Sequence, residues 1–323
     1  MFRIYDISAF DKVNLEELGT KSKFWYADES GCEFLFKSVV TYDKDGREIK
    51  RYGEDWAEKV ACELAKALDI PCADYELAIY NGERGVFTPN IVVDKTLSLS
   101  LGNEILKKYN DQQSLGTQEK QNIFLVYLIM RRLIRNKPLK FNSQAGIKSA
   151  ADFFCGYLML DALISNQDRH SENWGFLTTK NGTYHLSPTF DHAASLGRNE
   201  SIEKKSLRLT SKDKGQKVET YVKKSKSYFY LKENRLKTLS AFEFFGILTP
   251  NAALKWIEKI KNYPSERFDE ILNLIPKEVL DDVSKQFASK MFNCNRDNII
   301  SLEETFVKCL NPTVRKELMR TYE

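Results

Sequence analysis

The feature that most constrains the fold is a turn signal in the middle of the chain, at Asn181-Gly182. This dipeptide is the strongest short-range signal for a β-hairpin. The residues on its two sides, 174–180 and 183–190, are typical of strands, and apolar side chains alternate along the second run as in a strand with one buried face. The sequence therefore predicts a hairpin over residues 174–191.

The predicted hairpin brings two polar residues together at its open end. A two-residue turn at 181–182 would set residue 173 opposite 190 and residue 172 opposite 191, with the strands roughly 5 Å apart. Asn173 and Asp191 would then be near neighbours. Because strict pleating would aim them at opposite faces, this arrangement requires a bulge or an irregular strand end.

Asn173 also ends a polar loop, 166–173, which reads Asn-Gln-Asp-Arg-His-Ser-Glu-Asn. Asp168 stands five positions before Asn173, which is the spacing with which kinases place a catalytic base beside a magnesium ligand. Phosphoryl transfer needs a carboxylate to accept the proton of the attacking hydroxyl, and oxygen ligands to hold metal against nucleotide phosphates. Asp168, Asn173 and Asp191 would supply that set. An apolar helix predicted at 150–164 would support the loop.

Each of these residues also has an ordinary structural interpretation. Asp168, Arg169 and His170 could form a surface salt bridge, and Asp191-His192 could cap the following segment. An aspartate and an asparagine at this spacing occur by chance in many chains, so the motif needs structural context. The hairpin and the supporting helix provide that context and favour a metal–nucleotide site.

Composition describes an ordinary globular chain of 323 residues, with 42% hydrophobic and 29% charged residues. The first six residues turn charged at once and show no signal-peptide pattern. The longest apolar run, 123–130, is too short to span a bilayer. We therefore expect no membrane insertion and a cytoplasmic location, with translocation to a host cell left open.

Residues 1–90 are rich in strand signals and contain one predicted helix, 54–68. Lys37 closes a predicted strand and Glu58 lies on the first turns of the helix. Kinases hold a phosphate-contacting lysine in this way, with a helix glutamate as its ion-pair partner. The alternative is a lysine that simply ends a surface strand.

Two further segments are candidates for nucleotide contacts. Thr88, Pro89 and Asn90 would form the hinge, where the adenine contacts must use the neighbours of Pro89 because proline has no backbone N–H. The segment from Gly19 through Lys21 and Ser22 would be the phosphate loop, in which backbone amides can cradle phosphate. It has one glycine instead of a Gly-x-Gly-x-x-Gly run, and it also reads as an ordinary turn before a strand.

A basic stretch follows the predicted hairpin, at 204–226. In a kinase this position belongs to the segment that reads the substrate, so the stretch would attract an acidic protein surface or an RNA-bearing substrate. The alternative is a solvated, partly mobile loop. Against only Asp213 and Glu219, its cations are Lys204, Lys205, Arg208, Lys212, Lys214, Lys217, Lys223, Lys224 and Lys226.

Together, Lys37, Glu58, the loop at 166–173 and Phe190-Asp191 resemble the HipA-like serine/threonine kinases of bacteria. The resemblance covers about residues 15–300. It is closest to the short members, which lack an extra N-terminal subdomain and include toxin kinases of three-gene modules and a small secreted Helicobacter kinase.

The resemblance implies an α+β, bilobed protein-kinase-like fold, related to the phosphoinositide-kinase-like branch. The β-rich N-lobe would span 1–90 and the mainly helical C-lobe 91–323, with the catalytic loop at 166–173 and the metal-binding hairpin at 174–191. ATP and Mg²⁺ are the implied cofactors. By resemblance, Asp168 would be the catalytic base, His170 would brace its loop, Asn173 and Asp191 would bind magnesium, Lys37 would contact the ATP phosphates, and Glu58 would position Lys37.

The resemblance also implies phosphorylation of a protein, by a toxin or an effector. The substrate would be an aminoacyl-tRNA synthetase or another acidic or RNA-bearing protein, and an antitoxin is the expected partner. We do not expect direct nucleic-acid binding. Ser22 is the candidate for an autophosphorylation that disables the phosphate loop. Two rival functions remain: a small-molecule or lipid kinase of related fold, and a pseudokinase that binds without turnover.

Overall fold

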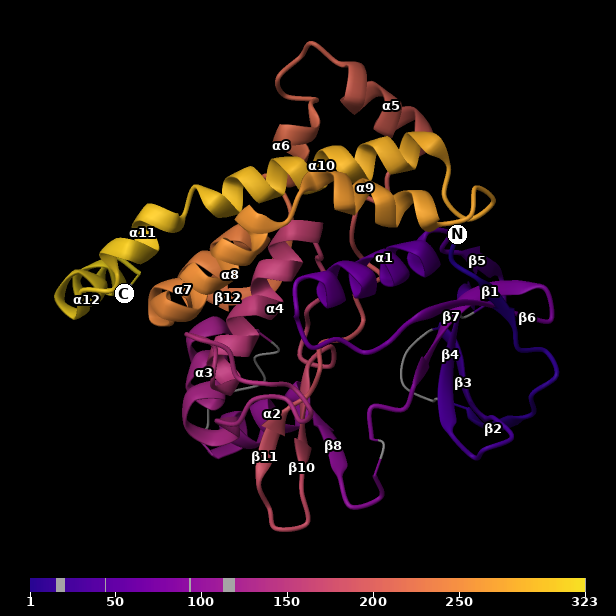
Figure 1. The fold of residues 1–323 in the computed structure, drawn as a ribbon, viewed down its shortest axis with the longest axis horizontal. Helices are drawn as coiled ribbons and strands as arrows, with labels where there is room; N and C mark the ends of the chain where they lie inside the picture. The colour runs from indigo at the N-terminus through magenta and orange to yellow at the C-terminus, as the bar shows by residue number, and fades with distance from the viewer. Residues whose placement is uncertain (16–20, 44, 93, 113–119, 323) are drawn as a thin grey trace.

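The computed structural model describes residues 1–322 apart from 16–20, 44, 93 and 113–119. A sheet-rich N-terminal region lies beside a helical C-terminal region (Figure 1). The predicted α+β, bilobed arrangement is therefore confirmed. Within the described residues, no helix combines the length and the apolar character that crossing a membrane requires.

The N-terminal region is a seven-stranded sheet with one helix. Its spatial order is β1-β6-β7-β4-β3-β2, with β5 paired to β4; β1 is parallel to β6 and the other pairs are antiparallel. The elements are β1 (Ile4–Asp6), β2 (Lys12–Leu15), β3 (Lys21–Ala27), β4 (Glu33–Tyr42), β5 (Glu48–Lys50), α1 (Glu54–Ala67), β6 (Glu76–Tyr80) and β7 (Glu83–Pro89).

One face of this sheet buries an aromatic cluster built on Phe24, Tyr26 and Phe36. The alternating positions of the same strands, including Lys37, therefore lie on the other face. Helix α1 packs against β4, β6 and β7, and also against α9 of the C-terminal region. The helix predicted at 54–68 is confirmed, and it connects the sheet to the helical region.

The C-terminal region is mainly helical and contains two small sheets, ordered β11-β10-β8 and β13-β12-β9. Its helices are α2 (Gly102–Gln112), α3 (Ile123–Leu128), the π-helix η1 (Ile129–Ile134), α4 (Ala150–Ile164), α5 (Ile202–Thr210), α6 (Val218–Val222), α7 (Thr238–Leu248), α8 (Pro250–Asn262), α9 (Ser265–Leu274), α10 (Asp282–Ile300), α11 (Glu303–Lys308) and α12 (Pro312–Arg320). Its strands are β8 (Ser98–Leu101), β9 (Gln121–Asn122), β10 (Gly175–Thr178), β11 (Tyr184–Leu186), β12 (Lys226–Leu231) and β13 (Asn234–Lys237).

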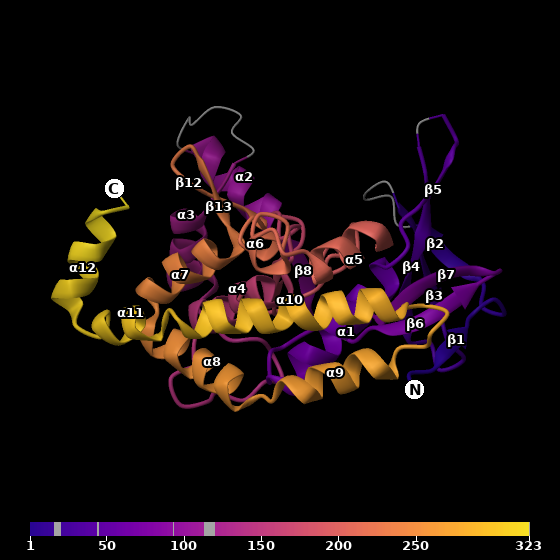
Figure 2. The same cartoon turned by 90° about the horizontal axis from the view of Figure 1, so that it is seen from above.

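Helix α4 forms the centre of the C-terminal core. All of its residues except Asp152 are buried, and a capping box between Ser149 and Asp152 fixes its start. It packs against α7, α8 and α10, and Figure 2 shows α10 running along the molecule beside it. The helix ends at Ser165 in the left-handed conformation. The bounds predicted for this helix are confirmed, and its C-terminal end leads directly into the polar loop.

The predicted hairpin is present as β10 and β11, but its register differs by one residue. Phe176 pairs with Leu186, and the Thr179 N–H donates to the Thr183 carbonyl at 3.0 Å. The loop therefore has three residues, with Gly182 at φ 76° and Asn181 outside the positive-φ region. A two-residue type I′ turn needs positive φ at both central positions, so the predicted two-residue turn, with residue 173 opposite 190, is wrong.

Candidate active site

Arg169 organises the polar loop from its buried centre. Its side chain is 1% exposed and forms a two-pronged ion pair with Asp161 of α4, with both N–O distances 2.8 Å. The third nitrogen, Nη1, donates to the Asn173 carbonyl at 2.7 Å and to the Phe190 carbonyl at 3.2 Å. One guanidinium thus joins the two chain segments that carry Asn173 and Asp191. The surface salt bridge considered for Arg169 is wrong.

Asp168 and His170 lie on the accessible side of this loop. Their side chains are 39% and 30% exposed, and His170 Nε2 is 4.0 Å from Asp168 Oδ1. His170 Nδ1 accepts a hydrogen bond from the Glu172 N–H at 3.2 Å. Because Nδ1 is an acceptor, the neutral ring carries its proton on Nε2, on the side of Asp168. The Asp168 carboxylate is therefore accessible from solvent.

Asn173 and Asp191 are held in defined orientations. Asn173 is buried and its Nδ2 donates to the Asp168 carbonyl at 2.7 Å, which leaves the amide oxygen on the other side of the group. Asp191 has φ 59°, a left-handed conformation that aspartate tolerates better than most residues. The strand β11 has already ended at Leu186, so the irregular strand end that the sequence required is present.

Lys37 of β4 contacts Asp191. The ammonium lies 3.4 Å from Asp191 Oδ1 and donates to the Tyr75 hydroxyl at 3.3 Å. Burial lowers the pKa of Lys37, but the carboxylates of Asp191 and Glu58 more than offset burial, so its pKa is raised above the ordinary value. Lys37 is therefore a fixed cation at neutral pH.

Glu58 is fully buried and engages His192. Its Oε1 accepts from the His192 N–H at 2.7 Å and lies 3.2 Å from His192 Nδ1. Lys37 thus pairs with Asp191 in place of the predicted partner Glu58. The left-handed backbone at Asp191 presents its carboxylate to the lysine, and the N–H of His192 binds Glu58 Oε1. In the described part of the chain, Glu58 Oε2 has no hydrogen-bond partner.

Arg198 makes a second connection between α1 and the segment after Asp191. Its Nη2 lies 2.6 Å from Glu54 Oε1, and its Nε donates to the Ala193 carbonyl at 2.9 Å. With the His192–Glu58 contact, the first two turns of α1 are attached to the chain that carries Asp191. Sequence reasoning considered only a capping role for His192 and no role for Arg198, although both follow the predicted metal ligand within seven positions.

The sheet face that carries Lys37 also presents the predicted hinge. Trp25, Leu35 and Thr88 are register partners across β3, β4 and β7, and form one row on this face. Thr88 is buried and Pro89 is exposed, while the Asn90 N–H donates to the Glu33 carbonyl at 2.9 Å. The Asn90 N–H is thus already bonded within the sheet, and the assignment of Thr88, Pro89 and Asn90 to adenine contacts stays a prediction. Leu35 and Trp25, on the same face, are apolar candidates for contact with an adenine ring, and the sequence did not indicate them.

The predicted phosphate loop lies partly outside the residues that the structure describes. Gly19 lies outside the described residues, and Lys21 and Ser22 begin β3 without described side chains. Their assignment to phosphate contacts, and that of Ser22 to autophosphorylation, stay predictions.

The basic stretch is helical over two parts, α5 and α6, so the partly mobile loop considered for it is not what the structure shows. Lys205 is buried and donates to Ser284 Oγ at 2.8 Å, and Arg208 pairs with Glu200 at 3.0 Å. These two cations serve the fold. The exposed lysines of the stretch are Lys204, Lys212, Lys214, Lys223, Lys224 and Lys226.

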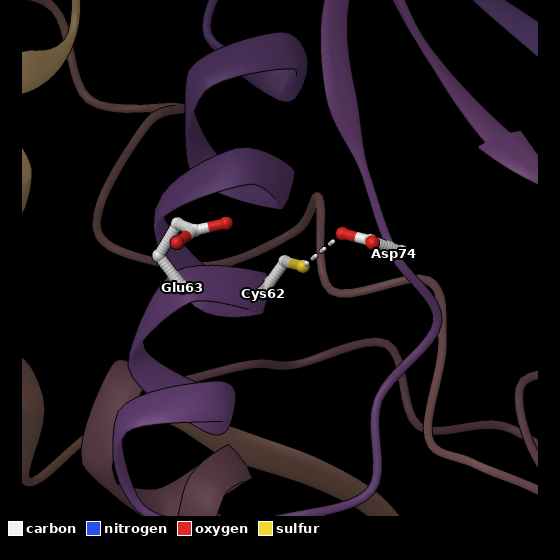
Figure 3. Close-up of side chains that lie close together, drawn as sticks. All are labelled: Cys62, Glu63 and Asp74. Carbon is white, nitrogen blue, oxygen red and sulfur yellow. Dashed lines mark hydrogen bonds between the residues drawn. The ribbon is translucent and has the colours of Figure 1, made fainter. Parts of the chain in front are cut away.

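A second cluster of potential metal ligands lies away from this site, at Cys62, Glu63 and Asp74 (Figure 3). Lys66 pairs with both carboxylates, and Lys59 lies 2.9 Å from Glu63. Lysine ammonium groups therefore already neutralise the acidic oxygens. The cluster is an ion-pair network that fixes the end of α1.

Comparison with known proteins shows the family of this chain. The sequence model of the HipA-like C-terminal domain family matches residues 9–237. The serine/threonine-protein kinase CtkA of Helicobacter pylori strain J99 is 26% identical over 145 residues, which are 44% of this chain and 40% of that protein. Similarity to a serine/threonine kinase thus extends over less than half of either chain.

Two solved structures show the same fold. The Helicobacter pylori proinflammatory kinase CtkA superimposes with a TM-score of 0.71 at 16% identity, covering 96% of this chain and all of that one. HipA of Shewanella oneidensis, in its complex with HipB and operator DNA, gives a TM-score of 0.51 at 11% identity, covering 92% and 67% of the two chains. The chain is kinase-like in sequence and in fold.

Proposed function

The chain belongs to the HipA-like C-terminal domain family, and on that premise we propose that it is an ATP- and Mg²⁺-dependent serine/threonine protein kinase. The observation that carries the proposal is the guanidinium of Arg169, which joins the backbones of Asn173 and Phe190. Asn173 in turn bonds the backbone carbonyl of the half-exposed Asp168, and Asp191 directly follows Phe190, so an amide oxygen and a carboxylate would be available near Asp168. This is the set of groups that phosphoryl transfer requires from a protein.

Asp168 would accept the proton of the attacking hydroxyl. The His170 ring, with Nε2 4.0 Å from Asp168 Oδ1, would limit the positions that this carboxylate can take. Asn173, fixed through Nδ2, would hold its amide oxygen ready as a ligand. The half-exposed position of Asp168 fits an acceptor that arrives from solvent.

The residues fit a nucleotide with its metal ion. Asp191 and the Asn173 amide oxygen are hard oxygen donors of the kind that Mg²⁺ prefers. The Lys37 ammonium against Asp191 shows that this carboxylate already stabilises a cation, and the buried Glu58 Oε2 is an acceptor that Lys37 can take when a metal ion holds Asp191. Bound Mg²⁺ would neutralise the charge that develops on the transferred phosphoryl group.

The direct test of the activity incubates the protein with γ-labelled ATP and Mg²⁺, alone and with casein or myelin basic protein as acceptor. We expect label on serine or threonine, located by mass spectrometry, which also examines Ser22. A protein that binds ATP but labels no acceptor, itself included, would be the non-catalytic binding module. Transfer to lipid or small-molecule hydroxyls alone would establish the other rival function.

A metal-binding prediction follows and does not depend on turnover. The melting temperature should rise more with ATP and Mg²⁺ than with ATP and EDTA, because ligand binding to the folded state adds to its stability, by about 2.7 kcal/mol at a hundred times the dissociation constant. Asp191→Asn should lose most of the Mg²⁺-dependent part of this shift. Asn173→Ala should reduce it also.

The control for this prediction is Asp213→Asn, which removes one exposed carboxylate outside the site. Each shift is compared with the ligand-free value of the same variant, so the loss of the Lys37 ion pair in Asp191→Asn does not distort the result. A Mg²⁺-dependent shift equal to that of the unmodified protein in Asp191→Asn would remove Asp191 from the metal site.

A further inference from the structure

The hairpin of β12 and β13 lies directly beside the catalytic loop. The ring of Tyr228 meets the ring of His170 edge to face, with 5.4 Å between the centroids. His170 Nε2 is in turn 4.0 Å from Asp168 Oδ1. Tyr228 keeps 38% of its surface exposed. Whatever approaches Asp168 from this side therefore meets Tyr228.

Tyr228 faces outward from β12 next to an irregularity in the strand pairing. The register shifts between Lys226 and Tyr230, and Ser227 and Phe229 on either side of Tyr228 are buried. Ser227 Oγ donates to the Leu236 carbonyl and accepts from the Phe229 N–H, which fixes this irregular part of the hairpin.

Three cations surround Tyr228 on the exposed face. The Arg235 guanidinium lies 4.7 Å from the Tyr228 ring centroid, and its Nε donates to the Ser227 carbonyl at 2.5 Å. Lys226 and Lys237 are direct register partners across the two strands, and both are exposed. Like charges directly opposite each other destabilise a strand pair. The fold itself therefore gains nothing from this placement.

Two acidic residues stand in the hairpin turn and in the catalytic loop, and each already has a partner. Glu233, in the turn of the hairpin, pairs with Lys120, and Glu172 accepts from Asn103 Nδ2 at 3.3 Å. The face formed by Lys226, Tyr228, Arg235 and Lys237, here called the hairpin face, thus presents positive charge around an aromatic ring. A ligand that suits it is negatively charged.

We propose that the hairpin face binds acidic side chains that flank the acceptor serine or threonine of a protein substrate. This inference rests on the proposed kinase function and names its substrate class. Successive contacts from Asp168 through His170 and Tyr228 to Arg235 span 4.0 to 5.4 Å each. An extended segment covers that path with about four residues at 3.3 to 3.6 Å apiece, so the acidic residues lie two to four positions from the acceptor.

The binding test uses two fluorescein-labelled serine peptides without ATP. One carries glutamates two to four positions from the serine on both sides, and the other carries glutamines there. We expect fluorescence anisotropy to show at least tenfold tighter binding of the glutamate peptide, weakening as salt is added. The triple variant Lys226→Gln, Arg235→Gln, Lys237→Gln should lose that preference.

The matched control removes three positive charges elsewhere, by Lys277→Gln, Lys316→Gln and Arg320→Gln, all at exposed positions. It should bind the glutamate peptide within twofold of the unmodified protein. Equal binding of both peptides, or an equal loss in the control, overturns the proposal. So does a single-stranded RNA oligonucleotide that binds more tightly than the glutamate peptide and displaces it, because the face then selects nucleic acid.

A transfer assay separates this inference from the function on which it rests. The ratio of kcat/KM for the glutamate peptide over the glutamine peptide should be at least ten, and should fall toward one in the triple variant. Transfer without any preference for glutamate overturns the acidic substrate class and leaves the kinase proposal intact. Preferential binding without transfer to any acceptor contradicts the kinase proposal and leaves the binding face intact.

Discussion

Asp168→Asn is expected to lower the rate of phosphoryl transfer by about 10²- to 10⁴-fold, the usual contribution of a positioned general base. Asparagine has the same shape as aspartate but cannot accept the proton of the acceptor hydroxyl. The loop should keep its conformation, because Asn173 Nδ2 and the His170 N–H both bind the backbone carbonyl of Asp168. Initial rates of transfer to a protein acceptor, with nucleotide affinity measured separately, check this expectation.

The control is Glu172→Gln, which removes an equal charge from an exposed residue of the same loop. Its rate should stay within about twofold of the unmodified protein, since exposed charges contribute little. Nucleotide affinity should be similar in both variants. If Asp168→Asn transferred phosphate at the rate of the Glu172→Gln control, Asp168 would not be the base.

The parts of the fold that local sequence determines were predictable. Helix α4 is apolar on every side and begins with a capping serine, so its bounds follow from its own residues. The turn at Asn81-Gly82, which separates β6 from β7, also carries a recognisable hairpin signal. The register at Asn181-Gly182 was not predictable to the residue, because a two-residue loop and a three-residue loop both accept glycine in the left-handed position.

The candidate site was predictable as a set of residues, and its internal connections were not. Asp168, Asn173 and Asp191 are recognisable by type and spacing. The ion pair of Lys37 with Asp191 depends on a backbone angle at Asp191 and on where His192 places its N–H. Contacts between residues more than a hundred positions apart determine both features. A local sequence pattern carries no information about such contacts.

The charges of the basic stretch likewise do not show from sequence alone which of them face solvent. Its cations are equivalent in sequence, yet Lys205 is buried against Ser284 and Arg208 pairs with Glu200. The hairpin face takes only Lys226 from that stretch and adds Arg235 and Lys237 from the next strand. Which cations face a substrate is therefore decided by strand pairing.

Arg169→Met is expected to have the largest effect on stability, lowering the free energy of unfolding by about 3–5 kcal/mol. The substitution leaves the Asp161 carboxylate, 4% exposed, without its cation. Urea unfolding measures the loss. Arg208→Met is the matched control, because it removes an arginine from the more exposed pair with Glu200 and should cost about 1 kcal/mol or less. A loss no larger than that of the control would contradict the structural role of Arg169.

The double variant Asp161→Leu, Arg169→Met separates folding from positioning. It leaves no buried charge, so the part of the lost stability that comes from the unpaired Asp161 carboxylate should return. The rest should not, because Asn166 Nδ2 and the carbonyls of Asn173 and Phe190 still lack their partners. Phosphoryl transfer should stay impaired, because no guanidinium then joins the carbonyls of Asn173 and Phe190. Recovery of stability together with full transfer would mean that Arg169 serves folding alone, and that Asn173 and Asp191 hold their places without it.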